Sequence, residues 1–350
     1  MSPVWLIVFV SLAMRRSDAF RVRIRALYQA AGNQHGSVTL RTHRFVIGVD
    51  GGATKTVALI GTENGKILGR GESGPSNYHN VGTLAASLAI KEAVTEACKD
   101  ARVKQSNLEF AVVALAAADS AKDKVTAARF LRNVRIARKN IVVHDSVAAL
   151  HAATHGRPGI IVISGTGCVA AGINGSGKYV RAGGWGYLVD DEGSAYDIGT
   201  KALRSAFRRI DGRGHKTKLI SILKRRFRVE TLEDALSTIY SKRFGVNGIA
   251  ALTPLVSRSA ASDKVCRGIL NSAGVTLADL ACVVAKRLRM TNEAFPIVLV
   301  GGTFKAGRYL LEPFQARIRK QCPRAKIEIM KIEPAQGAFS LAVSEFQKRH

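Results

Sequence analysis

Two segments of the chain show the same succession of apolar and polar positions. Each has a run of apolar residues, a short turn rich in glycine and threonine, and a second apolar run. The first segment covers residues 45–60 and the second covers residues 159–173. Short apolar runs bounded by glycine turns are typical of buried strands. The pattern therefore predicts two strand–turn–strand hairpins, one at the start of each half of the chain.

The first half continues with further short elements. Apolar runs and helical spacing predict strands at 66–71, 110–118 and 141–143 and helices at 83–101, 123–133 and 146–154. A polar loop is expected over 72–80, and Thr83 is a candidate N-cap for the helix that follows it. Glycine and proline at 156–159 favour a domain boundary there.

The second half is mostly helical after its hairpin. Helical patterns cover 195–243 and 245–289, and they include one long apolar-spaced helix at 262–289. Strands are expected at 296–300 and 327–329, and a last helix at 335–348. Strands that precede helices in both halves predict an α/β fold with one mixed sheet in each lobe. The first lobe covers 45–156 and the second covers 157–335.

The net charge of +27 on 350 residues is the unusual feature of the composition. Residues 201–230 alone hold eleven Lys or Arg against Asp211 and Glu230. Such a charge attracts nucleotides, sugar phosphates or nucleic acid. Because no nucleic-acid motif or interleaved aromatic residue accompanies it, we favour a solvated basic face, with nucleic-acid binding as the open alternative.

The N-terminal residues differ from the rest in pattern. The apolar run at 4–14 is too short to cross a bilayer comfortably, and Arg15 and Arg16 follow it, whereas a signal peptide carries positive charge before its apolar run. We therefore expect no membrane association, and we interpret 1–44 as a non-native extension from an upstream start, with the true start near Val38 or Leu40.

The five cysteines are isolated in the sequence. No CxxC pair and no Cys/His cluster with zinc spacing occurs, which argues against a structural metal or a disulfide framework. Buried reduced thiols in a cytoplasmic protein are the better interpretation.

Each hairpin turn has the composition of a phosphate-binding loop. In the first, Asp50 precedes Gly51, Gly52 and Thr54, so that backbone N–H groups and one hydroxyl could hold an anion and Asp50 could hold Mg²⁺. The second turn, Ser164–Gly167, has the same design. A glycine-rich hairpin without a ligand is the alternative for either turn alone, but two equivalent turns are more specific. GxxxxGK[ST] and GxGxxG motifs are absent from the expected places.

Three further segments carry candidate chemistry. Asp145 follows a short strand and begins a helix, so it is either an N-cap or a general base at the mouth of a cleft. The loop 183–194 combines glycines, acids and Trp185; it suits hydroxyl recognition against a sugar face, or it is a structural loop whose acids cap the next helix. Gly301 and Gly302 follow a strand and could admit an adenine, unless they form an ordinary turn.

In their order along the chain, these segments resemble the N-acetylglucosamine kinase branch of the BadF/BadG/BcrA/BcrD ATPase family, within the actin–Hsp70–sugar kinase superfamily. The matching stretches, spread over residues 45–340, are VIGVDGGATKT, VVHDSVAAL, ISGTGCVAAGINGSGK, GGWGYLVDDEGSAYDIG, VLVGGTFKAG and EPAQGAF. The combination of GGWG with DEGSAY is the most specific, since the wider superfamily shares the phosphate turns.

The resemblance implies two actin-like (ribonuclease H-like) lobes with mixed five-stranded sheets, an ATP cleft between them, and a terminal helix at 336–350 that returns to the first lobe. ATP and Mg²⁺ are the implied cofactors, with Asp50 organising the metal and Asp145 as the catalytic base. The implied phosphate and nucleotide contacts are Gly51, Gly52, Thr54, Lys55, Gly165, Thr166, Gly167, Gly301 and Gly302. The implied sugar contacts are Asn77, Asp145, Thr166, Gly184, Trp185 and Asp191.

The implied reaction is ATP-dependent phosphorylation of the 6-hydroxyl of N-acetylglucosamine or a related hexosamine or hexose. The chain departs from the family at Asp190, where glycine is usual, and at Ala182, where animal N-acetylglucosamine kinases have a cysteine that contacts the sugar. Glucosamine, glucose and other hexoses therefore stay open as substrates, as does the homodimer common in the family.

Two alternatives belong to other classes. One is a family ATPase that activates reductases or dehydratases through an iron–sulfur cluster; the second turn here reads SGTG rather than GGQD, and the cysteines are scattered. The other is a nucleotide-dependent switch, which would have no use for a sugar loop.

Overall fold

The computed structural model describes residues 44–52, 54–116, 118, 121–330 and 333–350. The predicted extension over 1–44 lies outside the described residues except for Arg44. Residues 44–350 form one compact unit.

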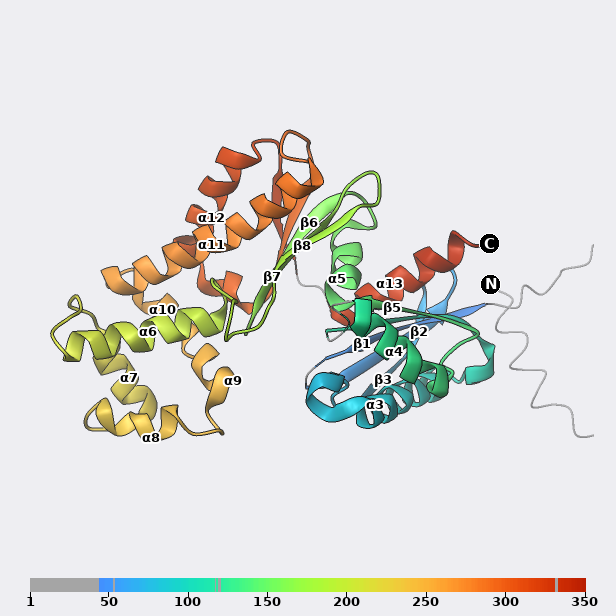
Figure 1. Ribbon diagram of the computed structural model, residues 1–350, viewed down its shortest axis with the longest axis horizontal. Coiled ribbons are helices and arrows are strands. Elements are labelled where there is room, and N and C mark those ends of the chain that lie inside the picture. The colour runs from blue at the N-terminus through green and yellow to red at the C-terminus, as the bar shows by residue number, and fades with distance from the viewer. Residues whose placement is uncertain (1–43, 53, 117, 119–120, 331–332) are drawn as a thin grey trace, which may run out of the picture. The chain divides into compact units, whose positions relative to one another are not determined.

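The first sheet has five strands in the order β3-β2-β1-β4-β5 (Figure 1). Strands β1, β2 and β3 form the antiparallel part, and β4 and β5 are parallel to β1. The strands are β1 (Phe45–Gly51), β2 (Thr56–Thr62), β3 (Ile67–Ser73), β4 (Leu108–Leu115) and β5 (Lys139–His144). The mixed sheet expected from the sequence is confirmed.

The second sheet repeats this plan in the order β10-β9-β6-β7-β8. Strands β6, β7 and β8 are antiparallel, and β9 and β10 are parallel to β6. The strands are β6 (Gly159–Ser164), β7 (Cys168–Ile173), β8 (Tyr179–Gly183), β9 (Pro296–Val300) and β10 (Lys326–Ile329). Each sheet therefore begins with a hairpin whose turn carries glycine and threonine, as the repeated pattern predicts.

Helices cover both faces of the first sheet. They are α3 (Tyr78–Asp100), α4 (Ala121–Val134), α5 (Asp145–Thr154) and α13 (Pro334–Gln347), with a short 3₁₀ helix η1 at Gln105–Asn107. Ile47 and Val49 of β1 pack in the cluster that contains residues of α3 and α4, whereas Val46 packs in the cluster that contains residues of α5 and α13. Neighbouring residues of a strand point to opposite faces, so β1 is apolar throughout because both of its faces are covered.

The terminal helix lies unusually close to this sheet. A Cβ placed on Gly48 would be 2.0 Å from the backbone nitrogen of Phe339. Glycine is therefore required at this position of β1 for α13 to approach. The contact brings the C-terminal end of the chain against its first strand, where Figure 1 shows α13 beside β1.

The helices of the second half surround one large core. They are α6 (Ala195–Ile210), α7 (Leu219–Phe227), α8 (Leu236–Ile239), α9 (Gly245–Ala250), α10 (Thr253–Ser259), α11 (Lys264–Leu288) and α12 (Arg308–Gln321), with 3₁₀ helices η2 (Glu233–Ala235) and η3 (Gly302–Ala306). The long helix expected at 262–289 is confirmed as α11. It begins at Lys264 because Asp263 caps it and accepts hydrogen bonds from the N–H groups of Val265 and Cys266.

Among the described helices, only α11 is long and apolar enough to cross a bilayer by length and composition. Half of its most apolar stretch is buried within the protein. Core packing accounts for this composition.

Two sequence predictions were wrong in detail, and a third was incomplete. The helix expected from Thr83 is preceded by a turn of helix that starts at Tyr78 after the N-cap Asn77, and Gly82 (φ 80°, ψ 161°) separates the two parts of α3. The strand expected at 110–118 runs from Leu108 to Leu115. The helical pattern at 195–243 is broken into separate helices, with a glycine-containing turn after α6 and a left-handed Arg228 after α7.

Candidate active site

The first glycine turn joins β1 to β2 and is held to the loop before α3. The Gly52 N–H donates to the carbonyl of Lys55 (3.0 Å), and the Gly52 carbonyl accepts from the N–H groups of Ser76 and Asn77, each at 3.1 Å. The Thr56 hydroxyl donates to the carbonyl of Gly74 (2.8 Å). Thr54 and Lys55 are exposed. The turn therefore has a fixed base and a solvent-facing tip, as a phosphate loop requires.

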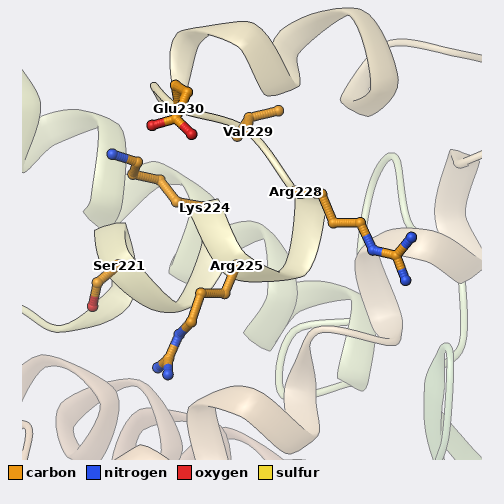
Figure 2. A pocket seen from close by; sticks show the side chains of 6 residues that line it. All are labelled: Ser221, Lys224, Arg225, Arg228, Val229 and Glu230. Atoms are coloured by element: carbon orange, nitrogen blue, oxygen red, sulfur yellow. The ribbon is translucent and has the colours of Figure 1, made fainter.

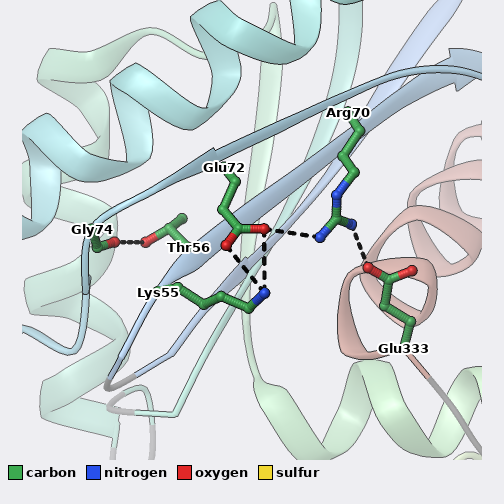
Figure 3. Close-up of polar contacts among 6 residues, drawn as sticks. All are labelled: Lys55, Thr56, Arg70, Glu72, Gly74 and Glu333. Atoms are coloured by element: carbon green, nitrogen blue, oxygen red, sulfur yellow. Dashed lines mark hydrogen bonds and ion pairs between the residues drawn. The ribbon is translucent and has the colours of Figure 1, made fainter.

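Charged side chains connect this turn to the start of the terminal helix (Figure 3). The Lys55 ammonium lies 3.2 Å from both carboxylate oxygens of Glu72, and Arg70 donates to Glu72 and to Glu333. Glu333 directly precedes α13. Lys55, an implied phosphate contact, thus belongs to an exposed ion-pair network.

Asp50 is the electrostatic centre of the first turn. Burial, and after it the carboxylates of Asp145 and Glu333, raise the pKa of Asp50 to about 7, while Lys55 acts in the opposite direction. The carboxylates of Asp145 and Glu333 are therefore near enough to act on Asp50 electrostatically. The family resemblance implied roles for Asp50 and Asp145. It implied none for Glu333, although Glu333 is the first residue of the matching stretch EPAQGAF.

The carboxylates around Asp50 fit the Mg²⁺ that the family resemblance implies. A divalent cation would relieve the repulsion that raises the pKa of Asp50. Within the described residues, no group of three or more His, Cys, Asp or Glu side chains is arranged to enclose a metal. Magnesium at nucleotide sites needs no such cage, since it keeps water ligands and uses one or two carboxylates together with phosphates.

Asp145 is the first residue of α5, but it does not cap that helix. The N-cap is His144, whose Nδ1 accepts from the Ser146 N–H (3.3 Å). The alternative interpretation of Asp145 as an N-cap is therefore wrong. Its side chain is 38% exposed and lies 2.9 Å from His144 Nδ1. The carboxylate has solvent on one side and an imidazole on the other, an arrangement suited to accepting a proton.

The same imidazole connects Asp145 to the second half of the chain. His144 Nδ1 lies 2.7 Å from the Ser146 hydroxyl, which lies 2.7 Å from the Tyr179 hydroxyl of β8. His144 Nδ1 can donate to Asp145 in one tautomer or accept from Ser146 in the other. His144 and Tyr179 were not expected from the sequence, because the network depends on residues far apart along the chain.

The second glycine turn, between β6 and β7, is joined to the start of α6. The carbonyl of Gly165 accepts from the Ala195 N–H (2.8 Å), and the carbonyl of Thr166 accepts from the Tyr196 N–H (3.3 Å). Thr166 is exposed at the tip. These bonds hold the turn against the segment that follows the GGWG…DEGSAY loop.

Asp191 is the link between the second turn and that loop. Its Oδ1 accepts from the Cys168 N–H (2.9 Å), and a Cβ on Gly167 would lie 2.7 Å from its Oδ2. Asp191 is buried and adopts a left-handed conformation (φ 64°). Burial raises the pKa of Asp191, the Cys168 N–H lowers it, and Asp190 raises it.

A second aspartate of this loop holds the loop's backbone in place. Asp190 Oδ2 accepts from the Trp185 N–H (3.3 Å), so the unusual aspartate closes the loop. Ser194, rather than an acid, caps α6. Trp185 is 66% exposed, and the Arg181 guanidinium lies 4.4 Å from its ring centroid. Gly184 (φ 76°) packs on Val169 of β7.

The turn after β9 also lies against the second phosphate turn. A Cβ on Gly301 (φ 118°) would be 2.1 Å from the carbonyl oxygen of Ser164. The Thr303 hydroxyl donates to the carbonyl of Gly165 (3.3 Å). Gly301 and Gly302 are exposed beyond this contact, so their backbone is accessible to a ligand.

Asn77, which the family resemblance implies as a sugar contact, is the N-cap of α3. Its Oδ1 accepts from the His79 N–H (3.1 Å) as the N-cap of α3, and its own N–H bonds Gly52. The residue therefore lies next to the first phosphate turn.

The structure gathers the expected residues into two groups. Asp50, Gly52, Lys55, Asn77 and Asp145 lie around the first turn, and Gly165, Thr166, Gly167, Gly184, Asp191 and Gly301 lie around the second. Among the described residues, no hydrogen bond or ion pair joins the two turns directly.

Comparison with known proteins gives matches over most of the chain. The model of the BadF/BadG/BcrA/BcrD ATPase family matches residues 47–342. An N-acetylmuramic acid/N-acetylglucosamine kinase of Clostridium acetobutylicum is 34% identical over 305 residues, which cover 86% of this chain and 99% of that relative. An N-acetyl-D-glucosamine kinase of Dictyostelium discoideum is 34% identical over 310 residues, which cover 85% of this chain and 97% of that relative. The crystal structure of a candidate N-acetylglucosamine kinase from Chromobacterium violaceum has a TM-score of 0.68 at 26% identity and covers 86% of this chain and 99% of its own.

Proposed function

Because the chain belongs to the BadF/BadG/BcrA/BcrD ATPase family, we propose that it is an ATP-dependent sugar kinase. It transfers the γ-phosphoryl group of ATP to the 6-hydroxyl of N-acetylglucosamine or of a related hexosamine or hexose. Relatives with N-acetylglucosamine kinase in their names align over almost their whole length.

One structural observation supports a sugar kinase in particular. Asp191, in the loop that suits sugar hydroxyls, accepts from the Cys168 N–H directly after the second glycine turn. A carboxylate that binds hydroxyl groups and a turn that binds phosphate are thereby held within one hydrogen bond of each other. A phosphotransferase needs acceptor and donor in this proximity, whereas a nucleotide switch does not.

Asp145 is the base in this proposal. Its exposed carboxylate accepts the proton of the sugar hydroxyl as the oxygen attacks phosphorus. In the tautomer with a proton on Nδ1, His144 donates to the Asp145 carboxylate and holds it in place. The N–H groups of the two glycine turns stabilise the negative charge of the transferred group. When bound beside Asp50, Mg²⁺ would neutralise phosphate charge.

The experiment that tests the proposal is a coupled assay of ADP release with Mg-ATP. The panel contains N-acetylglucosamine, N-acetylmuramic acid, glucosamine, N-acetylmannosamine, glucose, mannose and no sugar. Turnover that appears only with one or a few sugars supports the kinase and identifies its substrate. Hydrolysis without any sugar dependence contradicts it and favours a nucleotide switch or an activating ATPase.

We also place the enzyme in the cytoplasm, since its cysteines are free thiols. A homodimer stays a prediction of the family resemblance, and sedimentation of the purified protein would test it.

A further inference from the structure

The helical part of the second half carries a concentration of positive charge that the kinase mechanism does not use. Residues 201–268, all of them described, contain sixteen Lys or Arg and five Asp or Glu. Several hollows on this surface are lined by these cations. These hollows differ in whether the cations that line them can contact one ligand together.

The hollow at the end of α7 lacks such convergence (Figure 2). The side chains of Lys224, Arg225 and Arg228 point in different directions around the helix end, and Glu230 adds a carboxylate. This surface therefore has no single place where several cations meet one ligand.

The hollow between α6 and α11 is built differently. It has a volume of about 630 Å³, and its cations come from three segments of the chain. Lys201 and Arg204 come from α6, Lys216 from the following loop, and Lys264 from the first turn of α11; His215 of the same loop also lines the hollow. Among the described residues, only Lys201 of these has an acidic partner within 4.0 Å, so the positive charge is largely uncompensated. A concave surface with one sign of charge attracts an anion of the opposite sign.

The floor of this hollow is apolar and open. Val265 and Ile269 contribute aliphatic surface, and Gly268 lies between them on α11. A Cβ on Gly268 would meet no protein atom within 4 Å. Glycine weakens a helix interior, and here it leaves space in the hollow rather than allowing a close helix contact.

One residue of the hollow is connected to the loop 183–194, the sugar loop of the proposed kinase. Lys201 Nζ donates to Asp197 Oδ2 (2.7 Å), and the same oxygen accepts from the N–H of Gly193 (2.8 Å). Gly193 lies two residues after Asp191. An anion that draws Lys201 away from Asp197 would loosen the carboxylate that anchors the end of the sugar loop.

We propose that the hollow between α6 and α11 is a second binding site for a small phosphorylated molecule, and that its occupancy weakens sugar binding through Lys201, Asp197 and Gly193. The phosphate groups contact Lys201, Arg204, Lys216 and Lys264, and the remainder of the ligand covers the apolar floor. The binding site stands on the hollow itself, and only its effect on sugar rests on the proposed function.

The binding test uses inorganic pyrophosphate, titrated into the full chain by calorimetry without Mg²⁺. We expect Arg204→Glu and Gly268→Leu each to weaken binding by at least about 10-fold, one by reversing a charge and the other by filling the hollow. Arg225→Glu, which makes the same charge change at the divergent cations of α7, is expected to change affinity less than about 2-fold. Thermal unfolding of each variant checks that it is folded.

Three outcomes would overturn the site. The wild type could fail to bind pyrophosphate. Arg204→Glu and Arg225→Glu could weaken binding equally, which would indicate only non-specific electrostatic attraction of the anion to the basic surface. Binding could also survive in both Arg204→Glu and Gly268→Leu, which would place the anion elsewhere, for example at the phosphate turns.

The coupling test needs no phosphoryl transfer, so its failure and failure of the kinase proposal are distinguishable. The chain has two tryptophans, and a Trp5→Phe background leaves Trp185 of the sugar loop as the reporter. Pyrophosphate is expected to change Trp185 fluorescence, and Asp197→Asn is expected to abolish the change while pyrophosphate affinity is kept or raised, because Lys201 no longer has to leave a carboxylate. A change that persists in Gly268→Leu or in Asp197→Asn would contradict the coupling.

Discussion

The Asp191 carboxylate accepts a hydrogen bond from the Cys168 N–H, with Oδ1 2.9 Å from the nitrogen. The residues are 23 positions apart, one in the glycine-rich loop before α6 and the other at the start of β7. The bond makes the loop 183–194 and the second glycine turn one structural unit. In the kinase that we propose, Asp191 therefore bears on acceptor binding and on the position of the turn.

Asp191→Asn should weaken sugar binding more than ATP binding. The amide keeps an oxygen for the Cys168 N–H and tolerates a positive φ, but it loses the charge that strengthens hydrogen bonds from sugar hydroxyls. We expect the KM for sugar to rise by at least about 10-fold, with the KM for ATP within about 2-fold. Steady-state kinetics measure both. Glu192→Gln, an exposed neighbour, is the matched control, and an equal effect of the two changes would contradict the specific role of Asp191.

Asp145→Asn should remove proton transfer and leave nucleotide binding intact. The substitution is nearly isosteric, so the contacts of α5 are kept while the base is lost. We expect kcat to fall by at least about 10²-fold, with ATP affinity measured by calorimetry unchanged. Asp279→Asn, in the surface pair with Arg317, serves as the control for loss of one negative charge. Near-normal turnover of Asp145→Asn would refute the assignment of the base.

Gly48→Ala should destabilise the docking of the terminal helix. The new methyl group would lie 2.0 Å from the Phe339 nitrogen, which is backbone and cannot rotate away. We expect the free energy of unfolding to fall by about 1–3 kcal/mol, as in other overpacked cores. Chemical denaturation measures this loss, and faster proteolysis of the C-terminal residues would show its place.

Gly268→Ala is the comparison for that experiment. Its added Cβ meets no protein atom within 4 Å, and the position is helical. Alanine is a better helix former than glycine, so this variant should be as stable as the wild type or more so. Equal destabilisation of the two variants would contradict the contact argument at Gly48.

Asp263 should make stability depend on pH in the acid range. Burial opposes the charge of Asp263, but hydrogen bonds from Lys218, Thr217, Cys266 and Val265 outweigh it and hold the pKa below its usual value. A carboxyl whose pKa is lower in the folded state stabilises the fold above its unfolded pKa of about 3.9, and this contribution disappears as the pH falls through the folded value.

The test is denaturant unfolding of wild type and Asp263→Ala between pH 3 and pH 7. We expect a constant difference of about 2–3 kcal/mol above about pH 5 and a shrinking one below about pH 4. Asp234→Ala removes an exposed carboxylate that accepts from the Thr231 N–H, and it should change stability much less. A difference for Asp263→Ala that grows as the pH falls would show that the sign is wrong.

Local pattern was sufficient for most of the fold. The apolar runs and glycine turns of the two hairpins predicted β1–β2 and β6–β7, because strands buried on both faces leave a continuous apolar signature. The long helix α11 was also predicted correctly from the spacing of its apolar residues. The pattern missed the turn of helix before Gly82, because the Asn77 side chain caps it and no apolar spacing marks it.

For the candidate site, the sequence by itself determined the chemistry available: which turns carry glycine and threonine, and which positions carry carboxylates. It did not determine which carboxylates meet. Glu333 enters the neighbourhood of Asp50 only because α13 docks on β1 through the space left by Gly48. His144, rather than Asp145, caps α5 because the ring orientation allows it. The connection of Asp191 to Cys168, and of Lys201 to Gly193 through Asp197, likewise arises from packing between distant segments. Hydrogen bonds and burial depend on distances in space, and spacing along a chain does not contain those distances.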